Sequence, residues 1–362
     1  MGATFSIITK DLIQQLELLK DIVPSYPTIR ILENIKLEGD GRQLQITASD
    51  NETTIITKCK YKGDEFATVL PLIPLTKVLS ICGKKIEITL NDRSCIIKSE
   101  NHECVIPTFD SNEYPKYDFE DDPKMNTPLY PDFIKELKKA ADFVSKDELR
   151  RPMTRVLLDV KGTFIKIVST DAHAMFFAQF EITDDIEEKV LVPFKGLQYL
   201  KSCDGMMSLF NNHLHFKFDD LLIQIRIDNE SKYPDYETVI PDPNNYIGKI
   251  GFNKLLFVDA VKKVMELQYH TSSYSDSHII VELVSSKLSI SSNDNEDEMR
   301  FQIWIDGTGS GEYKPFKIDY KRLYPLLNSI DGDFIYMNFS EGEKGIIVSC
   351  HGQKRLIMPV RI

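Results

Sequence analysis

Three stretches of the chain carry apolar residues at helical spacing. In each stretch an apolar residue recurs every three or four positions, which is typical of a helix that buries one face. The apolar positions are Leu12, Leu16, Leu19 and Val23, then Phe133, Leu137, Ala140 and Val144, then Leu255, Val258, Val261 and Met265. The stretches begin at Asp11, Asp132 and Asn253, which are 132 − 11 = 121 and 253 − 132 = 121 residues apart. This equal spacing indicates an internal repeat.

Each predicted helix is followed by a segment in which apolar and polar residues alternate before a polar turn. The three segments are 44–50, 165–171 and 288–294. Their central isoleucines, Ile46, Ile167 and Ile290, are 167 − 46 = 121 and 290 − 167 = 123 residues apart. Alternation with period two predicts half-buried antiparallel strands.

A second helix and a further strand complete each copy. We expect the helices at 75–82, 194–203 and 320–330, and the strands at 95–99, 214–218 and 345–350. Two copies also share the motif Tyr-Pro-x-Tyr, at Tyr114 and Tyr233, which are 233 − 114 = 119 residues apart. The pattern predicts an α+β chain of three tandem units, 1–124, 125–245 and 246–362, with linkers at 119–128 and 241–248.

Charge and cysteine usage narrow the class of protein. The net charge is 44 − 55 = −11, which argues against a basic surface overall but allows a local basic patch. The N-terminus lacks the features of a signal peptide, and no apolar run is long enough to span a membrane. The six cysteines include no C-x-x-C pair, so we expect reduced thiols, no structural zinc and a cytoplasmic protein.

Four segments, by their order and spacing, resemble the β sliding clamp family of the bacterial replicative DNA polymerase. They are 31–35, 169–173, 233–241 and 358–362, and the resemblance extends over the full length. It implies three clamp modules, each with two helices packed on antiparallel sheet, and two chains closed head to tail into a ring. It further implies a protein without catalysis or cofactor that encircles duplex DNA regardless of sequence. The implied partners are the polymerase catalytic subunit, a clamp loader, other proteins with a clamp-binding motif and a second copy of the chain, with no membrane partner.

The resemblance implies that basic side chains of the helices and of one loop face the DNA. Such residues attract phosphates without reading bases, which is compatible with sliding. They are Lys10, Lys20, Lys77, Lys135, Lys138, Lys139, Arg150, Arg151, Lys195, Lys201, Lys262, Lys263, Lys321 and Arg322. The alternative is an ordinary solvated helix face.

The resemblance also implies a groove between the second and third modules for short extended peptides with apolar anchors. We call its residues the partner groove: Met153, Thr170, Ala172, His173, Ala174, Met175, Pro234, Thr238, Val239, Leu356, Met358, Pro359, Val360 and Arg361. Ala174 and Thr238 stand where the family often has arginine, so we expect weaker binding of peptides with acidic flanks. These residues also suit a core between modules, and both roles are compatible.

The dimer contact is expected between Cys104, Val105 and Ile106 of one chain and Val264 and Met265 of the other. Pairing these edges in a closed ring would remove two exposed strands.

Three other chemistries are weighed against the clamp. Asp171 and His173 suggest a metal-dependent hydrolase, but no nucleophile motif accompanies them. The glycine-rich segment 307–311 lacks the lysine of a phosphate loop and predicts a flexible hairpin or loop. The acidic groups at 120–122, 184–185 and 294–298 lack calcium-loop spacing and indicate solvated loops. A further rival is a clamp-like module that binds partners without encircling DNA.

Overall fold

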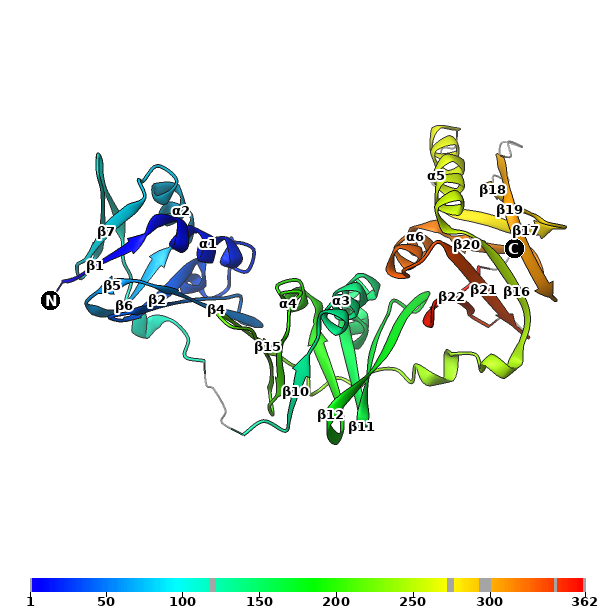
Figure 1. Cartoon of the computed structure of the whole chain (residues 1–362), viewed down its shortest axis with the longest axis horizontal. Coiled ribbons are helices and arrows are strands. Elements are labelled where there is room, and N and C mark those ends of the chain that lie inside the picture. Colours follow the sequence, from blue (N-terminus) through cyan, green and yellow to red (C-terminus); the bar gives the residue numbers. More distant parts are fainter. Residues whose placement is uncertain (1, 118–121, 272–276, 293–300, 342–343, 361–362) are drawn as a thin grey trace. The chain divides into compact units, whose positions relative to one another are not determined.

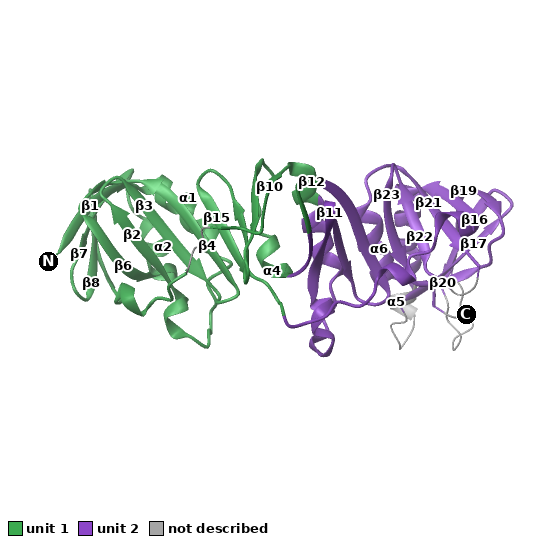
Figure 2. Ribbon diagram, turned by 90° about the horizontal axis from the view of Figure 1, so that it is seen from below, with its two compact units in different colours: residues 1–135, 182–186, 192–229 green, residues 136–181, 187–191, 230–362 purple. Residues whose placement is uncertain are grey.

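The computed structural model describes residues 2–117, 122–271, 277–292, 301–341 and 344–360 (Figure 1). The chain divides into two compact units (Figure 2). Unit 1 holds residues 1–135, 182–186 and 192–229, and unit 2 holds residues 136–181, 187–191 and 230–362. This division passes through the second predicted repeat, because the sheets described below continue across the borders that the sequence predicts between repeats.

All six predicted helices are present, with different ends. They are α1 Thr9–Leu19, α2 Leu72–Leu79, α3 Pro131–Ala140, α4 Phe194–Leu197, α5 Lys254–Thr271 and α6 Tyr320–Ser329. Helix α2 begins before Pro74, which the first turn tolerates because its N–H groups need no partner within the helix. Helix α4 is a single turn, shorter than predicted; Gly196, Ser202 and Asp204 of the predicted range or its border have low helix propensity. None of the helices described is long and apolar enough to cross a membrane.

Short 3₁₀ segments connect several of these elements. They are η1 Arg30–Glu33, η2 Ser111–Glu113, η3 Ala141–Phe143, η4 Glu148–Thr154, η5 Glu237–Val239 and η6 Pro243–Asn245. In η2 and η6 the aspartate just before the segment, Asp110 or Asp242, accepts a hydrogen bond from a backbone N–H of the first turn.

The strands form three sheets. The five-stranded sheet has the order β5 Lys62–Gly63, β1 Ala3–Ile8, β7 Lys85–Leu90, β8 Ser94–Ser99 and β9 His102–Pro107. The eight-stranded sheet has the order β10 Met125–Leu129, β13 Gly205–Leu209, β14 His213–Lys217, β15 Leu221–Arg226, β4 Thr53–Lys60, β3 Gln43–Ser49, β2 Asn34–Asp40 and β6 Glu65–Pro71. The ten-stranded sheet has the order β11 Arg155–Thr170, β12 Ala174–Pro193, β23 Gln353–Ile357, β22 Ile346–Cys350, β21 Phe334–Ser340, β16 Tyr246–Asn253, β19 Gln302–Gly311, β18 Lys287–Ser292, β17 His278–Val284 and β20 Phe316–Asp319.

One pairing pattern occurs three times in these sheets. The runs β1-β7-β8-β9, β10-β13-β14-β15 and β16-β21-β22-β23 each begin with the strand before a long helix and continue through three neighbouring strands. The last strand of the second run, β15, pairs with β4 through residues 221–225 and 53–57. The last strand of the third run, β23, pairs with β12 through residues 354–357 and 174–177. The last strand of the first run, β9, pairs only with β8 among the described strands.

The helices bury the faces that their apolar stripes predict, with one correction. Helix α1 packs against β4, and α5 packs against β18 and β19. In α5 the buried stripe is Phe257, Ala260, Val261 and Val264, whereas of the predicted residues Leu255 is 66% exposed and Val258 and Met265 are only half-buried. The predicted stripe is therefore right only at Val261, because Phe257 begins the i, i+3, i+4, i+7 pattern. Val264 has no exposed surface, so it belongs to the core of unit 2 and not to a dimer contact.

Two segments expected to be irregular contain strand, the first at its end and the second throughout. The predicted linker 119–128 ends inside β10, where Pro128 is tolerated because β10 lies at a sheet edge. The glycine-rich segment 307–311 is the second half of β19 and pairs with β16. A Cβ atom on Gly309 would lie 2.4 Å from Leu283 Cδ2, so the glycine is needed for close packing and does not mark a flexible loop.

Candidate functional site

The turn between β11 and β12 is held by side-chain hydrogen bonds. The hydroxyl of Thr170 donates to the carbonyl of Ala174 (2.8 Å) and accepts from the N–H of Ala172 (3.0 Å). Asp171 Oδ1 accepts from the N–H groups of His173 and Ala174, both at 2.8 Å. Ala172 has a φ of 75°, the left-handed region that favours glycine. These bonds compensate for that strain and hold this part of the partner groove in one conformation.

The turn between β3 and β4 has the same construction. The hydroxyl of Ser49 donates to the carbonyl of Thr53 and accepts from the N–H of Asn51. Asp50 Oδ1 accepts from the N–H groups of Glu52 and Thr53, and Asn51 has a φ of 77°. Because 171 − 50 = 121, the two turns stand at the spacing of the sequence repeat. The repeat therefore extends to individual hydrogen bonds.

Asp171 makes a second interaction through its other carboxylate oxygen. Its Oδ2 accepts from Arg322 Nε at 2.7 Å, and Arg322 also pairs with Asp319. Both carboxylate oxygens of Asp171 are thus engaged in structure. The carbonyl of the exposed His173 accepts from the N–H of Met358 at 2.7 Å. Through its two oxygens Asp171 holds both its own turn and Arg322 of α6.

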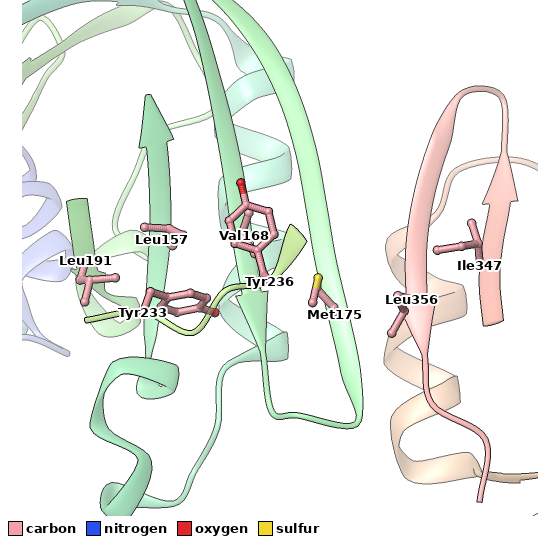
Figure 3. Packing of buried hydrophobic residues seen from close by; sticks show 8 residues of the cluster. All are labelled: Leu157, Val168, Met175, Leu191, Tyr233, Tyr236, Ile347 and Leu356. Carbon is pink, nitrogen blue, oxygen red and sulfur yellow. The ribbon is translucent and has the colours of Figure 1, made fainter. Parts of the chain in front are cut away.

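Strands β12 and β23 join across the partner groove. Met175 pairs with Leu356, and Ala174 pairs with Ile357. Met175 and Leu356 lie side by side on the same face of the sheet and belong to one buried apolar cluster (Figure 3). The cluster comprises Leu157, Val168, Met175, Leu191, Tyr233, Tyr236, Ile347 and Leu356, with Met358 packed against it. These groove residues therefore also form core, as the sequence allowed.

The second Tyr-Pro-x-Tyr motif is fixed to β11. The hydroxyl of Tyr236 donates to the buried Asp159 Oδ2 at 2.6 Å. Glu237 accepts from Lys161 at 3.1 Å and from Lys166 at 2.8 Å. Hydrogen bonds from these two lysines lower the pKa of Glu237 to about 2. Tyr236 and Glu237 are thus both fixed by hydrogen bonds. These bonds hold in place the backbone that leads directly into the groove residues Thr238 and Val239.

The groove residues border two cavities in unit 2. The larger, of about 1070 Å³, is lined by Met358, Pro359 and Val360 together with Ile247, residues 311–316, residues 339–341, Lys344 and Ile346. The smaller, of about 560 Å³, is lined by Asp171, His173 and Ala174 together with residues 142–147, Arg150, Asp319, Lys321, Arg322 and Pro325. The smaller cavity is lined by four basic residues and four aspartates, so their charges cancel. Cations therefore lie near Ala174, one of the two positions where the family often has an arginine.

The remaining groove residues are distributed as follows. Thr170, Met175 and Leu356 are buried, Met153 is half-buried, and Pro234, Thr238 and Val239 are exposed. The hydroxyl of Thr238 donates to the carbonyl of Asp235 at 2.9 Å. Arg361 lies outside the described residues.

The basic residues predicted to face DNA lie on or next to the helices and on η4. Those with mostly exposed side chains are Lys10, Lys20, Lys77, Lys135, Arg150, Arg151, Lys195, Lys262, Lys263 and Lys321. Lys138, Lys139, Lys201 and Arg322 are half-buried. Burial lowers the pKa of Lys138.

Several of these cations already have acidic partners. Lys139 contacts Glu136 at 2.8 Å and Asp331 at 3.2 Å, and Lys263 contacts Asp259 at 2.7 Å. A phosphate would have to compete for these lysines. Lys263 is exposed and still paired, so exposure alone does not select the cations that would contact DNA.

Acidic clusters give no metal centre in the part of the chain that is described. No group of three His, Cys, Asp or Glu side chains is arranged there to hold an ion. Asp184 accepts hydrogen bonds from the N–H of Asn126 and the hydroxyl of Thr183. Residues 120–121 and 294–298 lie outside the described residues.

Sequence reasoning missed two features near the groove. It gave no signal that residues 312–316, residues 339–341, Lys344 and Ile346 meet at the larger cavity, which they do because β19, β16 and β21 lie side by side in the sheet. It also missed Arg355, a charged residue that is 1% exposed. The sequence indicates its burial only through the place of this cation in the strand, where the alternating pattern puts an inward-facing residue.

Comparisons with known proteins extend over the whole chain. Residues 3–118 match the family of the DNA polymerase III beta subunit, N-terminal domain. The beta sliding clamps of Pseudomonas putida and Vibrio cholerae are 22% and 23% identical, each aligned over 99% of this chain and 100% of the relative. The solved DNA polymerase sliding clamp of Bacillus subtilis matches with a TM-score of 0.91 at 20% identity, over 100% of both chains. The solved Pseudomonas aeruginosa clamp bound to griselimycin matches with a TM-score of 0.90 at 18% identity, over 100% of both.

Proposed function

We propose that this chain, which is similar to beta sliding clamps over its whole length, encircles duplex DNA and tethers the replicative DNA polymerase. The observation that carries this proposal is the repeated strand pairing. Strand β15 adds to the sheet of β4, and β23 adds to the sheet of β12. The protein acts as a processivity factor and is not itself catalytic.

We propose that the same pairing closes the ring in a homodimer. Strand β9 has the place in its run that β15 and β23 have in theirs, and its outer edge is unpaired among the described strands. The first half of β19, residues 302–306, pairs with β18 on one side only within the described chain. Strand β9 of one chain therefore adds to β19 of the other, with Cys104, Val105 and Ile106 at the contact. Met265, which is half-buried, remains a candidate, whereas Val264 does not.

The charge distribution suits DNA that slides. The dimer carries 2 × −11 = −22, so the acidic total discourages general adhesion to nucleic acid. The exposed cations of the helices then supply weak, sequence-independent attraction to phosphates. Enclosure provides the persistence that this attraction lacks.

We propose that the partner groove receives an extended peptide of the polymerase, of the clamp loader and of other clamp-binding proteins. Half-buried Met358 and exposed Val239 offer apolar contacts, and the flexible thioether adapts to different anchors. We further propose that the chain consists of three modules, 1–124, 125–245 and 246–362. We also propose that it is located in the cytoplasm. The rival hydrolase is disfavoured because both carboxylate oxygens of Asp171 are occupied.

Retention on circular DNA tests enclosure. Dimers reassembled around nicked circular duplex are expected to co-elute with it in gel filtration at high salt, where phosphate attraction is screened. Cutting the same circle once should lower the retained fraction by more than about tenfold, since a ring slides off a free end. Equal retention on both forms would indicate adhesion, and retention on neither would favour a clamp-like module that does not encircle DNA.

A further inference from the structure

Arg355 lies in β23 with its side chain fully inside unit 2, and each of its five N–H donors has an acceptor. Nε donates to Ser329 Oγ at 3.0 Å. Nη1 donates to the carbonyls of Phe177 at 3.2 Å and Lys354 at 2.8 Å. Nη2 donates to Glu136 Oε2 at 2.7 Å and to the carbonyl of Ser329 at 3.2 Å. The guanidinium therefore has no unsatisfied donor.

These bonds join three elements around one side chain. Glu136 belongs to α3, Ser329 ends α6, and Phe177 lies in β12. The guanidinium carbon also lies 3.8 Å from the ring centroid of Phe176, which is opposite Arg355 in the strand pair. The orientation of β23 relative to β12 and α3 is thus fixed by directional contacts.

The other sheet junction provides an internal comparison. Ile223 in β15 lies opposite Ile55 in β4, two residues before the pair Ile225 and Thr53. Arg355 lies opposite Phe176, two residues before the pair Ile357 and Ala174. Thr53 and Ala174 both follow the repeated turn, so Ile223 and Arg355 hold equivalent positions.

An isoleucine at this position is sufficient for a packed junction. Ile223 is fully buried, and apolar contact there stabilises without regard to direction. A buried ion pair adds little net stability, because removing two charges from water costs several kcal/mol. The planar fork of arginine instead fixes position through many bonds of defined geometry. At the junction of β23 with β12, the charged side chain of Arg355 therefore fixes the relative position of the strands more than it adds to the free energy of folding.

We propose that Arg355 is a positioning residue for the partner groove, which it sets by fixing β23 against β12 and α3. Three residues after Arg355, the N–H of Met358 donates to the carbonyl of His173. A small rotation of β23 would displace Met358, Pro359 and Val360 relative to the turn at 170–174. The inference rests on the proposed role of this groove in peptide binding.

The test measures the affinity of a short fluorescein-labelled peptide with leucine and phenylalanine anchors. The double variant Glu136→Leu, Arg355→Met removes both charges, and Lys139 keeps its contact with Asp331. We expect it to melt near the native temperature, because apolar replacement of a buried pair is often neutral or stabilising. We expect the Kd for the peptide to rise about tenfold, the size of a typical coupling between sites.

Two further variants separate positioning from stability. Arg355→Lys keeps the charge but loses the fork, and Ile223→Ala weakens the other junction. We expect Arg355→Lys to raise the Kd for the peptide. We expect Ile223→Ala to leave the Kd unchanged even if its melting temperature is as low as that of Arg355→Lys or lower. This pair of results would show that the groove depends on the geometry of Arg355 and not on overall stability. A native Kd in both the double variant and Arg355→Lys would overturn the proposal.

A groove variant distinguishes this proposal from the proposed function. Met358→Ala should weaken the peptide whatever the role of Arg355. If the native chain does not bind the peptide, or if Met358→Ala binds it as the native chain does, the groove itself is misplaced and the proposal falls with it. If Met358→Ala loses binding while the Arg355 variants do not, only the role of Arg355 is refuted.

Discussion

A chain carrying Val105→Glu is expected to sediment as a monomer at micromolar concentration. Val105 is 62% exposed on β9, the strand proposed to add to β19 of a second chain. A carboxylate buried there without a partner costs about 3 kcal/mol, and the closed ring contains the contact twice. The two losses together raise the dimer dissociation constant roughly 10⁴-fold. Sedimentation velocity over a dilution series measures the shift.

Matched changes check that the effect belongs to the strand edge. Ile303→Lys, on the half of β19 that pairs with β18, should also give monomers. Ile73→Glu, at a residue that is 63% exposed on α2, should leave the dimer unchanged. A native dimer in both edge variants would refute the pairing of β9 with β19.

Removal of residues 358–362 is expected to abolish binding of the partner peptide. Met358 packs against the apolar cluster, and Met358, Pro359 and Val360 line the larger cavity. Loss of a central apolar anchor site typically costs at least about 2 kcal/mol, and several contacts are lost here together. We therefore expect a fall in affinity of more than about a hundredfold, measured by fluorescence anisotropy.

The fold should survive this truncation, because β23 ends at Ile357 and keeps its pairing with β12 and β22. Outside the cluster, the segment contributes backbone bonds from Met358 and Val360 to the carbonyls of His173 and Lys317. Val284→Ala, at an exposed position of β17, is a control that should bind normally. Native affinity in the truncated chain would place the peptide elsewhere.

The sequence predicted features that depend on neighbours along the chain. The stripe of α1 at Leu12, Leu16 and Leu19 is buried as expected, because helical periodicity alone determines which residues share a face. The turns at Asp50 and Asp171 follow from local Ser/Thr-Asp chemistry. In the third copy the local pattern is ambiguous, since Leu255 and Phe257 both suit the start of a stripe and only tertiary packing selects Phe257.

Features that depend on distant residues were not predictable from local patterns. Arg355 is buried because Glu136, 219 residues away in the chain, reaches it from α3. The segment 307–311 is a strand because β16 lies beside it, although its glycines alone favour a loop. The distribution of the groove residues over two cavities likewise follows from the pairing of β12 with β23. Long-range pairing therefore decided what local pattern left open.

The most direct test of the central claim is the shape of the molecule in solution. Small-angle scattering combined with a mass measurement should give two chains of 41.6 kDa each around a central opening wide enough for duplex DNA. A mass of one chain at every concentration, or a dimer without an opening, would contradict enclosure as the basis of DNA retention.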